Sequence, residues 1–511
     1  MSVARLHEYE GKKLLAGAGI AVPGGRAVAS PDEARSIAAE IGRPVVVKMQ
    51  AWTTARASLG GIRFADTPDQ AAEAARDMLG MKVGSFEVDK VLVEQKLDIA
   101  EEYYAALVID DAARKPMLMF AMGGGSGIEA RAQARREAVV TRHIDVTRGL
   151  PDYDARNLVR RLGLAGRKLA DVSAALVGLV RVAIRNDART AEINPLVVTR
   201  DGQVVAADCR ISIDDYAVHR HPELGIEIAR ELDHPPTRLE RIAYAVEKND
   251  HRGTFYFAQL AQGFGPGEGY LGFHGAGGGG SMMSMDAITK AGLRIANFTD
   301  TSGNPSAAKV YRAAMIILAQ PNLDGYFGSG SGVASQEQYH SAYGLAKAFY
   351  EMDLSIPAVI RLGGNGEDRA VGILGNCARF VSAPVEGYRK DDTPVFCAER
   401  TRALVDAFTA DPARRRPMTR RSFRPPANGL TFAIHGGTVH VDLDRCDDRT
   451  NAVLAEFGGA VFDIRGGKPA LKLSAEEVAG RDSELIACEV ECRAKANDSV
   501  YVHLPIQGLW D

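Results

Sequence analysis

The sequence predicts an α/β protein with several domains. Its 511 residues are too many for one hydrophobic core. Short apolar strands alternate with amphipathic helices through the first 215 residues. Between residues 251 and 395, apolar strands run into glycine-rich turns with helices between them, which is typical of a doubly wound parallel sheet of the flavodoxin-like or Rossmann-like kind. A small α+β segment follows at 430–511.

Composition excludes several functional classes. Apolar residues make up 46% and charged residues 25% of the chain, as in ordinary globular proteins. A net charge of −3 gives no footprint for nucleic acid or an acidic membrane surface. No apolar run reaches membrane-spanning length, and the N-terminal segment lacks the apolar core of a signal peptide. Six cysteines without a Cys-x-x-Cys motif indicate a reduced, cytoplasmic setting.

The first 215 residues carry clear helix and strand signals. Two amphipathic stretches, 30–42 and 67–80, predict helices with Ser30 and Thr67 as their N-caps. The predicted strands are 44–50, 90–97, 102–110 and 116–124.

The second half begins with a charged helical connector at 216–250. Glycine-rich turns follow the strands predicted at 270–275, 323–330 and 357–365, and a helix is expected at 400–408. Residues 412–429 form an Arg- and Pro-rich linker. Its charges could form an anion site, but a solvated tether is the more common explanation. The predicted domains are therefore 1–215, 216–250, 251–400, 401–429 and 430–511.

Two patterns in the last segment invite a chemical interpretation that we do not favour. The alternation in "SELIACEVECRA" predicts a strand at 483–494, with Cys488, Val490 and Cys492 on one face. Without a third ligand nearby, these cysteines indicate a core strand and not a metal site. The stretch "AIHGGTVH" places His435 beside two glycines, which indicates a hairpin turn.

The stretch "AEINPLVVTRDGQVVAADCR", residues 191–210, reads as a hairpin with polar residues among apolar ones. Glu192 and Asn194 share a strand face because side chains alternate. A three-residue loop ending at Gly202 would set Asn194 opposite Asp208, whereas a two-residue loop would put Asp208 on the other face. We prefer the longer loop, because it gathers the polar groups. An amide and a carboxylate so placed suit Mg²⁺, although a solvated polar face is equally compatible.

A nucleotide site is suggested by the order of polar residues before this hairpin. Lys48 ends a strand, where an ammonium can meet phosphate oxygens. Arg56 follows in a loop that contains a Gly-Gly pair. Glu94 and Glu102 lie on or after the next strand and can accept from an adenine amine or ribose hydroxyls. Each residue alone is a weak signal. The prediction of a nucleotide site rests on the order in which these residues follow one another.

That order resembles the ATP-grasp fold, and the chain more closely resembles the beta subunit of succinyl-CoA synthetase and related ADP-forming acyl-CoA ligases. The resemblance covers about residues 4–395. The motifs that carry it are "LHEYEGKKLLAGAGIAVPGG", "VVVKMQ", "LVEQ..DIAEEYY", "EINPLVV", "HGAGGGG..MDAITKAG", "ANFTDTSGN" and "IRLGGN". It implies an ATP-grasp domain followed by a CoA-ligase domain, with 430–511 as an extra unit of unknown role.

The resemblance also implies roles for individual residues. Residues of the ATP site would be Lys48, Arg56, Glu94 and Glu102. Asn194 and Asp208 would hold Mg²⁺, which agrees with the longer hairpin loop. Glu192 would be catalytic, beside the phosphohistidine that moves between two sites.

The resemblance also implies an acyl-binding site formed by two glycine-rich turns. "FHGAGGGGSMMSMDAITKAG" is a strand, turn and helix whose backbone N–H groups attract an anion. The second turn would place Gly332, Val333 and Ala334 at substrate- and phosphate-binding positions. His274 stands where the family usually has an Asn that contacts the acid, which suggests an acid other than succinate. The alternative is a capped, satisfied histidine.

Two stretches depart from the family pattern. The loop "TTARASLGG", residues 53–61, has fewer glycines than usual and no Lys, which puts one phosphate contact and the base preference in doubt. The Asp-Val-Gly-Gly-Gly stretch of the family is "DTSGNPS" here, from Asp300.

The implied reaction is acid + CoA + ATP ⇌ acyl-CoA + ADP + phosphate, through an acyl phosphate and a phosphohistidine. In the family, the phosphorylated His and most CoA contacts belong to an alpha subunit. We therefore expect an alpha-type partner, a hetero-oligomer and no thioester formation by this chain alone. The alternatives are an ATP-grasp ligase with an amine acceptor and a non-catalytic nucleotide-binding regulatory protein.

Overall fold

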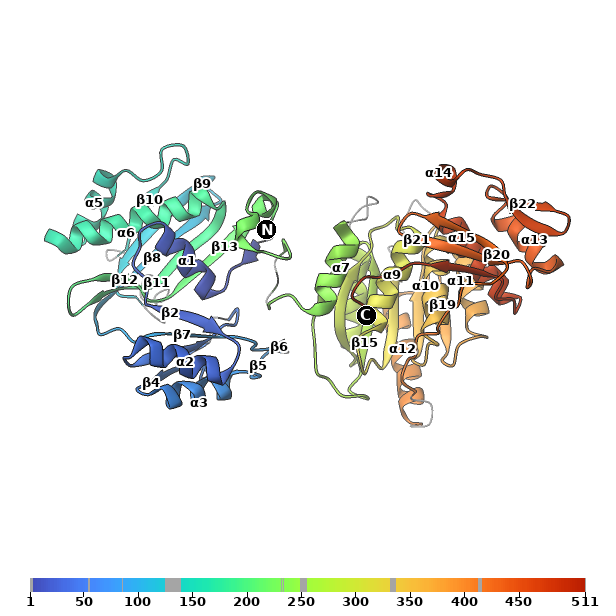
Figure 1. Ribbon diagram of the computed structural model, residues 1–511, viewed down its shortest axis with the longest axis horizontal. Helices are drawn as coiled ribbons and strands as arrows, with labels where there is room; N and C mark the ends of the chain where they lie inside the picture. The colour runs from blue at the N-terminus through green and yellow to red at the C-terminus, as the bar shows by residue number, and fades with distance from the viewer. Residues whose placement is uncertain are drawn as a thin grey trace. The chain divides into compact units, whose positions relative to one another are not determined.

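Two units, Met1–Pro236 and Thr237–Asp511, make up the chain in the computed structural model (Figure 1). The structure describes residues 3–53, 56–84, 86–124, 139–230, 232, 234–248, 255–330, 337–411 and 416–510. Gly332, Val333 and Ala334 lie outside the described residues, so their role stays a prediction. No helix in the described ranges is both long enough and apolar enough to cross a membrane.

The first unit is built from two antiparallel sheets and a small hairpin. Its strands are β1 (Val3–Arg5), β2 (Gly25–Val28), β3 (Val45–Met49), β4 (Ile62–Ala65), β5 (Lys82–Val83), β6 (Phe86–Glu87), β7 (Val91–Gln95), β8 (Ile99–Asp110), β9 (Lys115–Met122), β10 (Val139–His143), β11 (Ala188–Thr199), β12 (Val204–Ala206) and β13 (Cys209–Asp214). Its helices are α1 (Glu8–Gly17), α2 (Pro31–Ile41), α3 (Pro68–Met78), α5 (Asp152–Arg160) and α6 (Gly166–Arg185), with short 3-10 turns η2 (Asp215–Arg220) and η3 (Pro222–Leu224).

Each of the two main sheets has its own core. The larger has the strand order β1-β13-β11-β8-β9-β10, with β12 paired to β11, and packs against α1, α5 and α6. The smaller has the order β2-β7-β3-β4, and α2 and α3 cover it (Figure 1). Ser30 and Thr67 accept hydrogen bonds from Glu33 N and Gln70 N, so both predicted N-caps are confirmed.

The close approach of α1 to the larger sheet depends on a glycine. A Cβ atom added to Gly11 would lie 2.8 Å from Cys209 Sγ on β13. This is closer than side-chain atoms normally pack, so glycine lets α1 lie directly on the sheet. The first turn of α1 thereby reaches the hairpin that contains Asp208.

The hairpin at 191–210 has the three-residue loop that we preferred. Thr199 N donates to Gln203 O at 2.9 Å, and Gly202 adopts φ +84°. Asn194 N donates to Asp208 O at 3.1 Å, so these two residues face each other across the ladder. Glu192 pairs with Arg210, and the Asn194–Pro195 peptide bond is cis. The predicted gathering of the polar groups is confirmed.

The second unit contains a six-stranded sheet and the C-terminal segment. Its strands are β14 (Tyr256–Gln259), β15 (Tyr270–Ala276), β16 (Arg294–Asp300), β17 (Gly325–Gly330), β18 (Ala358–Arg361), β19 (Val385–Tyr388), β20 (Gly429–Ile434), β21 (Gly437–Asp442), β22 (Phe462–Arg465), β23 (Lys468–Leu471) and β24 (Val500–His503). Its helices are α7 (Arg238–Lys248), α8 (Gly278–Lys290), α9 (Ala307–Leu318), α10 (Tyr339–Glu351), α11 (Glu367–Cys377), α12 (Pro394–Thr409), α13 (Asp448–Phe457), α14 (Ala475–Val478) and α15 (Asp482–Ala494).

The six-stranded sheet is doubly wound, as predicted. Its order is β14-β16-β15-β17-β18-β19, in which β14 is antiparallel and the other strands are parallel. The parallel strands follow the flavodoxin-like order 2-1-3-4-5, with the switch point between β15 and β17. One face packs on α8 and α12, and the other packs on α9, α10 and α11. Ligands bind outside the carboxyl ends of the strands at such a switch point.

The C-terminal segment joins the core of this sheet and corrects one prediction. It contains the antiparallel sheet β20-β21-β24, the hairpin β22-β23 and three helices, and its apolar residues continue the core around α9 and α10. Residues 483–494 are helical, so the strand predicted there is wrong. Because α15 contacts α9, α10, α13 and β24, it is buried on several sides. Its apolar residues therefore do not follow the helical period, and the sequence pattern resembles that of a strand. The hairpin turn at His435 is confirmed.

A buried ion network joins the C-terminal segment to α10. Lys347 Nζ lies 2.5 Å from Glu351 Oε1 and 2.8 Å from Glu489 Oε2, and the Lys347 side chain is fully buried. Tyr311 Oη donates to Glu351 at 2.6 Å, and Arg493 pairs with Glu489 at 3.1 Å. Removal of one ion from such a network leaves a buried charge without its partner.

We expect Lys347→Met to lower the free energy of unfolding of the second unit by about 3–5 kcal/mol, because Glu351 and Glu489 lose their shared cation. Urea unfolding in a Trp52→Phe background measures this, since Trp510 is then the only tryptophan. Lys290→Met removes an exposed pair with Asp286 and serves as the control, with an effect below about 1 kcal/mol. Equal losses in both variants would contradict the role of Lys347.

Candidate functional site

The first unit gathers buried charges between its two sheets. Glu8 and Lys12 lie one turn apart on α1, and Lys12 Nζ is 2.7 Å from Glu8 Oε1. Lys12 also lies 2.5 Å from Glu94 Oε2 and donates to the Ala207 carbonyl at 2.9 Å. All three N–H groups of this ammonium are therefore used.

Lys48 has the same set of partners from the opposite side. It stands on β3, and Glu94 on the neighbouring β7 pairs with Val46, so the Lys48 and Glu94 side chains share one face. Lys48 Nζ lies 2.7 Å from Glu94 Oε1 and 2.9 Å from Glu8 Oε1, and it donates to Ala207 O at 2.8 Å. Two lysines from two elements thus share the same three acceptor groups.

Arg56 completes the cluster and connects it to the hairpin. Its Nη1 atom lies 2.5 Å from Glu8 Oε2, and its Nη2 atom binds Asp208 Oδ2. The cluster contains three cations, Lys12, Lys48 and Arg56, and three carboxylates, Glu8, Glu94 and Asp208, so the formal charges balance.

The charges shift one another's pKa values. Burial opposes ionisation of Glu8, but the neighbouring Lys48, Lys12 and Arg56 outweigh it and lower the Glu8 pKa. Burial likewise disfavours charged Lys48, yet Glu8 and Glu94 raise its pKa. Burial and the Glu8 charge raise the pKa of Asp208. Lys48 therefore remains a cation, which suits it to bind phosphate.

The hairpin presents the remaining polar groups. Asn194 Nδ2 donates to Glu192 Oε1 at 3.3 Å, so the two side chains lie together on β11 as predicted. Within the described residues, no group of three or more His, Cys, Asp or Glu side chains could hold a metal ion. One carboxylate and one amide oxygen, from Asp208 and Asn194, still suit Mg²⁺, because this ion keeps waters and takes substrate phosphates.

The structure brings three of the four predicted nucleotide-site residues together, namely Lys48, Arg56 and Glu94. The Glu94 carboxylate forms ion pairs with Lys12 and Lys48. The structure leaves Glu102 exposed on β8, outside the ion cluster. Sequence reasoning missed Glu8 and Lys12, whose i, i+4 spacing in "HEYEGKK" was the available signal.

The second unit holds His274 at the switch point of its sheet. The side chain is buried on β15, with Nδ1 2.6 Å from Tyr326 Oη and Nε2 3.3 Å from Thr301 Oγ1. Burial lowers the His274 pKa to about 3, so the ring is neutral near pH 7. Since Thr301 donates to Gly275 O, the network assigns the His274 proton to Nε2 and makes Tyr326 the donor to Nδ1. Both nitrogens thus have protein partners.

The turn after β15 leads directly into the glycine-rich start of α8. Gly277 adopts φ +98°, and its N–H donates to Asp300 Oδ1 at 2.9 Å. A Cβ atom on Gly275 would lie 2.2 Å from Ser281 Oγ, so a glycine is required there. The next residues begin α8, and Gly278 and Gly279 are exposed. Their N–H groups are free of intrahelical partners at a helix start, which is a favourable place for phosphate or carboxylate.

Comparison with known proteins matches both units. The ATP-grasp domain model matches residues 5–198. The succinate–CoA ligase [GDP-forming] subunit beta of Thermus thermophilus is 39% identical over 372 residues, which cover 72% of this chain and 93% of that protein. The succinate–CoA ligase [ADP-forming] subunit beta of Chloroflexus aurantiacus is 34% identical over 392 residues, which cover 76% and 97%.

A solved structure shares the fold. ATP citrate lyase from Methanothrix soehngenii, in complex with citrate and coenzyme A, aligns with a TM-score of 0.59 and 20% identity. The alignment covers 77% of this chain and 98% of that chain.

We expect Glu8→Gln to destabilise the first unit by about 3–5 kcal/mol at pH 7, because three buried cations lose a shared carboxylate. Since the Glu8 pKa is lowered on folding, its contribution is present above the unfolded value of about 4.3 and is lost as pH falls below it. Urea unfolding of a Trp510→Phe variant, followed by Trp52, measures both effects.

The control for this experiment is Glu40→Gln, because the Glu40 carboxylate is exposed beside Arg26. The unfolding free energy of Glu8→Gln should vary less between about pH 6 and 3 than that of the Glu40→Gln variant. Equal acid sensitivity in the two variants would contradict the assignment.

Proposed function

Because this chain belongs to the succinate–CoA ligase beta-subunit family, with an ATP-grasp domain at its N-terminus, we propose that it is the nucleotide-binding subunit of a carboxylate–CoA ligase. The reaction is acid + CoA + nucleoside triphosphate ⇌ acyl-CoA + nucleoside diphosphate + phosphate. The observation that carries the proposal is the buried cluster that brings Lys48 and Arg56 to the Asn194–Asp208 hairpin.

Binding of phosphate would exchange partners within this cluster. Lys48 and Arg56 are now neutralised by carboxylates of the chain itself, and the oxygens of a triphosphate would replace part of those contacts. If Arg56 turned from Asp208 to the phosphates, the Asp208 carboxylate would be available to hold Mg²⁺ together with the Asn194 amide oxygen. Bound Mg²⁺ supplies charge stabilisation at the transferring phosphoryl group. Exposed Glu102 is free to face the nucleoside.

The phosphohistidine step needs a second chain. We assign the relay histidine and most CoA contacts to an alpha-type partner, with Glu192 beside the phosphohistidine and the turn at Gly277–Gly279 facing the acyl carboxylate. Exposed Met282 and Met283 on α8, at 70% and 65%, support a protein contact next to that turn. All six cysteines are free, which supports the reducing environment of the cytoplasm.

Two further points concern which carboxylic acid the enzyme uses and whether its nucleotide is ATP or GTP. The names of the two relatives differ in the nucleotide product, so either ATP or GTP is compatible with family membership. We propose an acid other than succinate, because His274 stands where the family usually has an Asn. An amine acceptor is disfavoured by the relatives, and the intact ion cluster disfavours a degenerate regulatory site.

The direct test is co-expression with an alpha-type subunit and a screen of carboxylic acids for CoA- and Mg-nucleotide-dependent diphosphate release. We expect release with one acid, and a loss of at least about 100-fold in Asn194→Ala and Asp208→Ala, because metal ligands are removed. Asp201→Ala, in the exposed loop of the same hairpin, is the matched control. No release with any acid, or activity retained in both variants, would contradict the proposal.

A second test concerns the choice of acid. We expect His274→Asn to raise kcat/KM for succinate, relative to that for the acid found in the screen, by about tenfold or more. Tyr326→Phe removes the hydroxyl beside His274 without introducing an amide, and it controls for disturbance of the pocket. An unchanged ratio in His274→Asn would separate His274 from acid recognition.

A further inference from the structure

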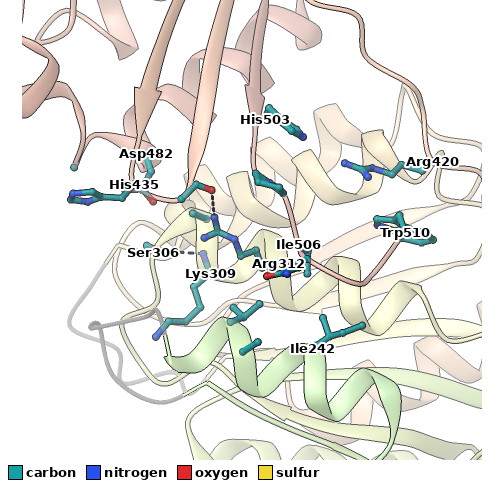
Figure 2. A pocket seen from close by; sticks show the side chains of 17 residues that line it. Ile242, Ser306, Lys309, Arg312, Arg420, His435, Asp482, His503, Ile506 and Trp510 are labelled. Atoms are coloured by element: carbon teal, nitrogen blue, oxygen red, sulfur yellow. Dashed lines mark hydrogen bonds between the residues drawn. The ribbon is translucent and has the colours of Figure 1, made fainter.

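A cavity lies where the C-terminal segment packs against α7 and α9. Its volume is about 1020 Å³, and all of its described lining residues belong to the second unit (Figure 2). One wall comes from α7 and α9. The other walls come from the segment before β20, the β20–β21 turn, the start of α15, the end of β24 and the C-terminal tail. The extra C-terminal segment therefore creates this cavity.

Cations outnumber carboxylates among the charged side chains of the cavity walls. Arg312, Arg420, His435 and His503 line it together with Lys309, whereas Asp482 is the one carboxylate among the described lining residues. In the close view, Arg420 and Trp510 stand at one end, and His435 and Asp482 stand at the other (Figure 2). Arg312 lies between them and donates to Gly436 O at 2.7 Å. The end that contains Arg420 is the cationic one.

Arg420 has no countercharge in the described part of the chain. Neither its guanidinium nor the His503 imidazole forms a hydrogen bond or ion pair with any described residue. The nearby buried carboxylates, Glu351 and Glu489, are already neutralised by Lys347 and Arg493. A guanidinium that is only partly exposed and unpaired favours an incoming oxyanion, because two parallel N–H groups can bind it.

The cavity also offers an apolar surface. Trp510 is 41% exposed, which is unusual for an indole, and Ile242, Val246 and Ile506 line the wall. The tail that carries Trp510 is fixed to α7, because Arg238 donates to the Leu509 carbonyl at 2.9 Å. Ligand pockets typically enclose about 300–1000 Å³ and combine an apolar lining with a few polar anchors. This cavity meets that description at its upper limit.

We propose that this cavity binds an organic oxyanion, with its carboxylate or phosphate group on Arg420 and His503 and its apolar or aromatic portion on Trp510 and Ile506. The proposal does not rest on the ligase reaction. It also gives the Arg-rich segment before β20 a ligand-binding role beyond that of a tether.

Trp510 provides a direct readout of binding. In a Trp52→Phe background it is the only tryptophan. We would titrate the full chain with AMP, which joins a phosphate to an aromatic base, with phthalate, which joins carboxylates to a ring, and with inorganic phosphate. The first two probes distinguish the two oxyanions, and the third tests charge alone.

The expected result is a saturable change of Trp510 emission with AMP or phthalate, weakened at least about tenfold by Arg420→Met and by His503→Asn. Arg424→Met changes an exposed arginine of the same segment that does not line the cavity, and it should bind as the parent does. Lys48→Met should also retain binding, which excludes the nucleotide site as the source of the signal.

Three results would overturn the proposal. They are no saturable change up to about 10 mM of either organic probe, an affinity that Arg420→Met and His503→Asn leave unchanged, and loss of binding in Lys48→Met. Thermal unfolding of each variant distinguishes loss of the site from loss of the fold. Failure of these titrations would leave the ligase proposal untouched, because that proposal is tested by turnover with different variants.

Discussion

The carbonyl oxygen of Ala207 accepts hydrogen bonds from two buried ammonium groups, and the first unit depends on that arrangement. Lys12 comes from a helix on the larger sheet, Lys48 comes from the smaller sheet, and Ala207 precedes the hairpin carboxylate. Neither lysine would be tolerated there without Glu8 and Glu94, because a buried ammonium without a counterion is strongly unfavourable. The cluster therefore fixes both sheets around one point.

The same arrangement explains how a stable protein can keep a phosphate site between two sheets. Cations that are to meet a triphosphate would repel one another in its absence. Here the chain supplies its own carboxylates, and Arg56 is held between Glu8 and Asp208. Exchange of these carboxylates for phosphate oxygens keeps the cations paired throughout. The exchange also affects Asp208, the proposed Mg²⁺ ligand. Arg56 is its ion-pair partner, and the Asp208 carboxylate would lose this partner when Arg56 binds phosphate.

The sequence predicted the features of the site that depend on neighbouring residues. It did not predict contacts between residues that are far apart along the chain. Gly202 and the polar alternation around Asn194 favoured the three-residue hairpin loop. Lys48 and Glu94 were identified from their places at a strand end and a strand edge, in an ordered set of polar residues. Glu8 lies 86 residues from Glu94 along the chain, and no periodicity connects them. The family resemblance supplied the residue roles, and it carries no information on contacts within the ion cluster.

The fold shows the same division. Glycine-rich turns after apolar strands predicted the doubly wound sheet of the second unit, and the structure supplied its strand order. Residues 483–494 were misread because burial on several sides of α15 removes the helical period from the pattern. The sequence did not predict the cavity, because its lining residues come from several separate segments of the chain. Of these segments, only the Arg-rich one was considered as an anion site.

We propose that Lys48, kept charged by Glu8 and Glu94, exchanges these partners for phosphate oxygens when a nucleotide binds. Calorimetric titration of the purified chain with Mg-ATP and Mg-GTP, compared with Lys48→Met, tests it most directly. Saturable binding of one nucleotide that weakens at least about tenfold in Lys48→Met is the predicted result. Equal affinity in the two proteins would contradict the claim and would leave the cluster a purely structural device.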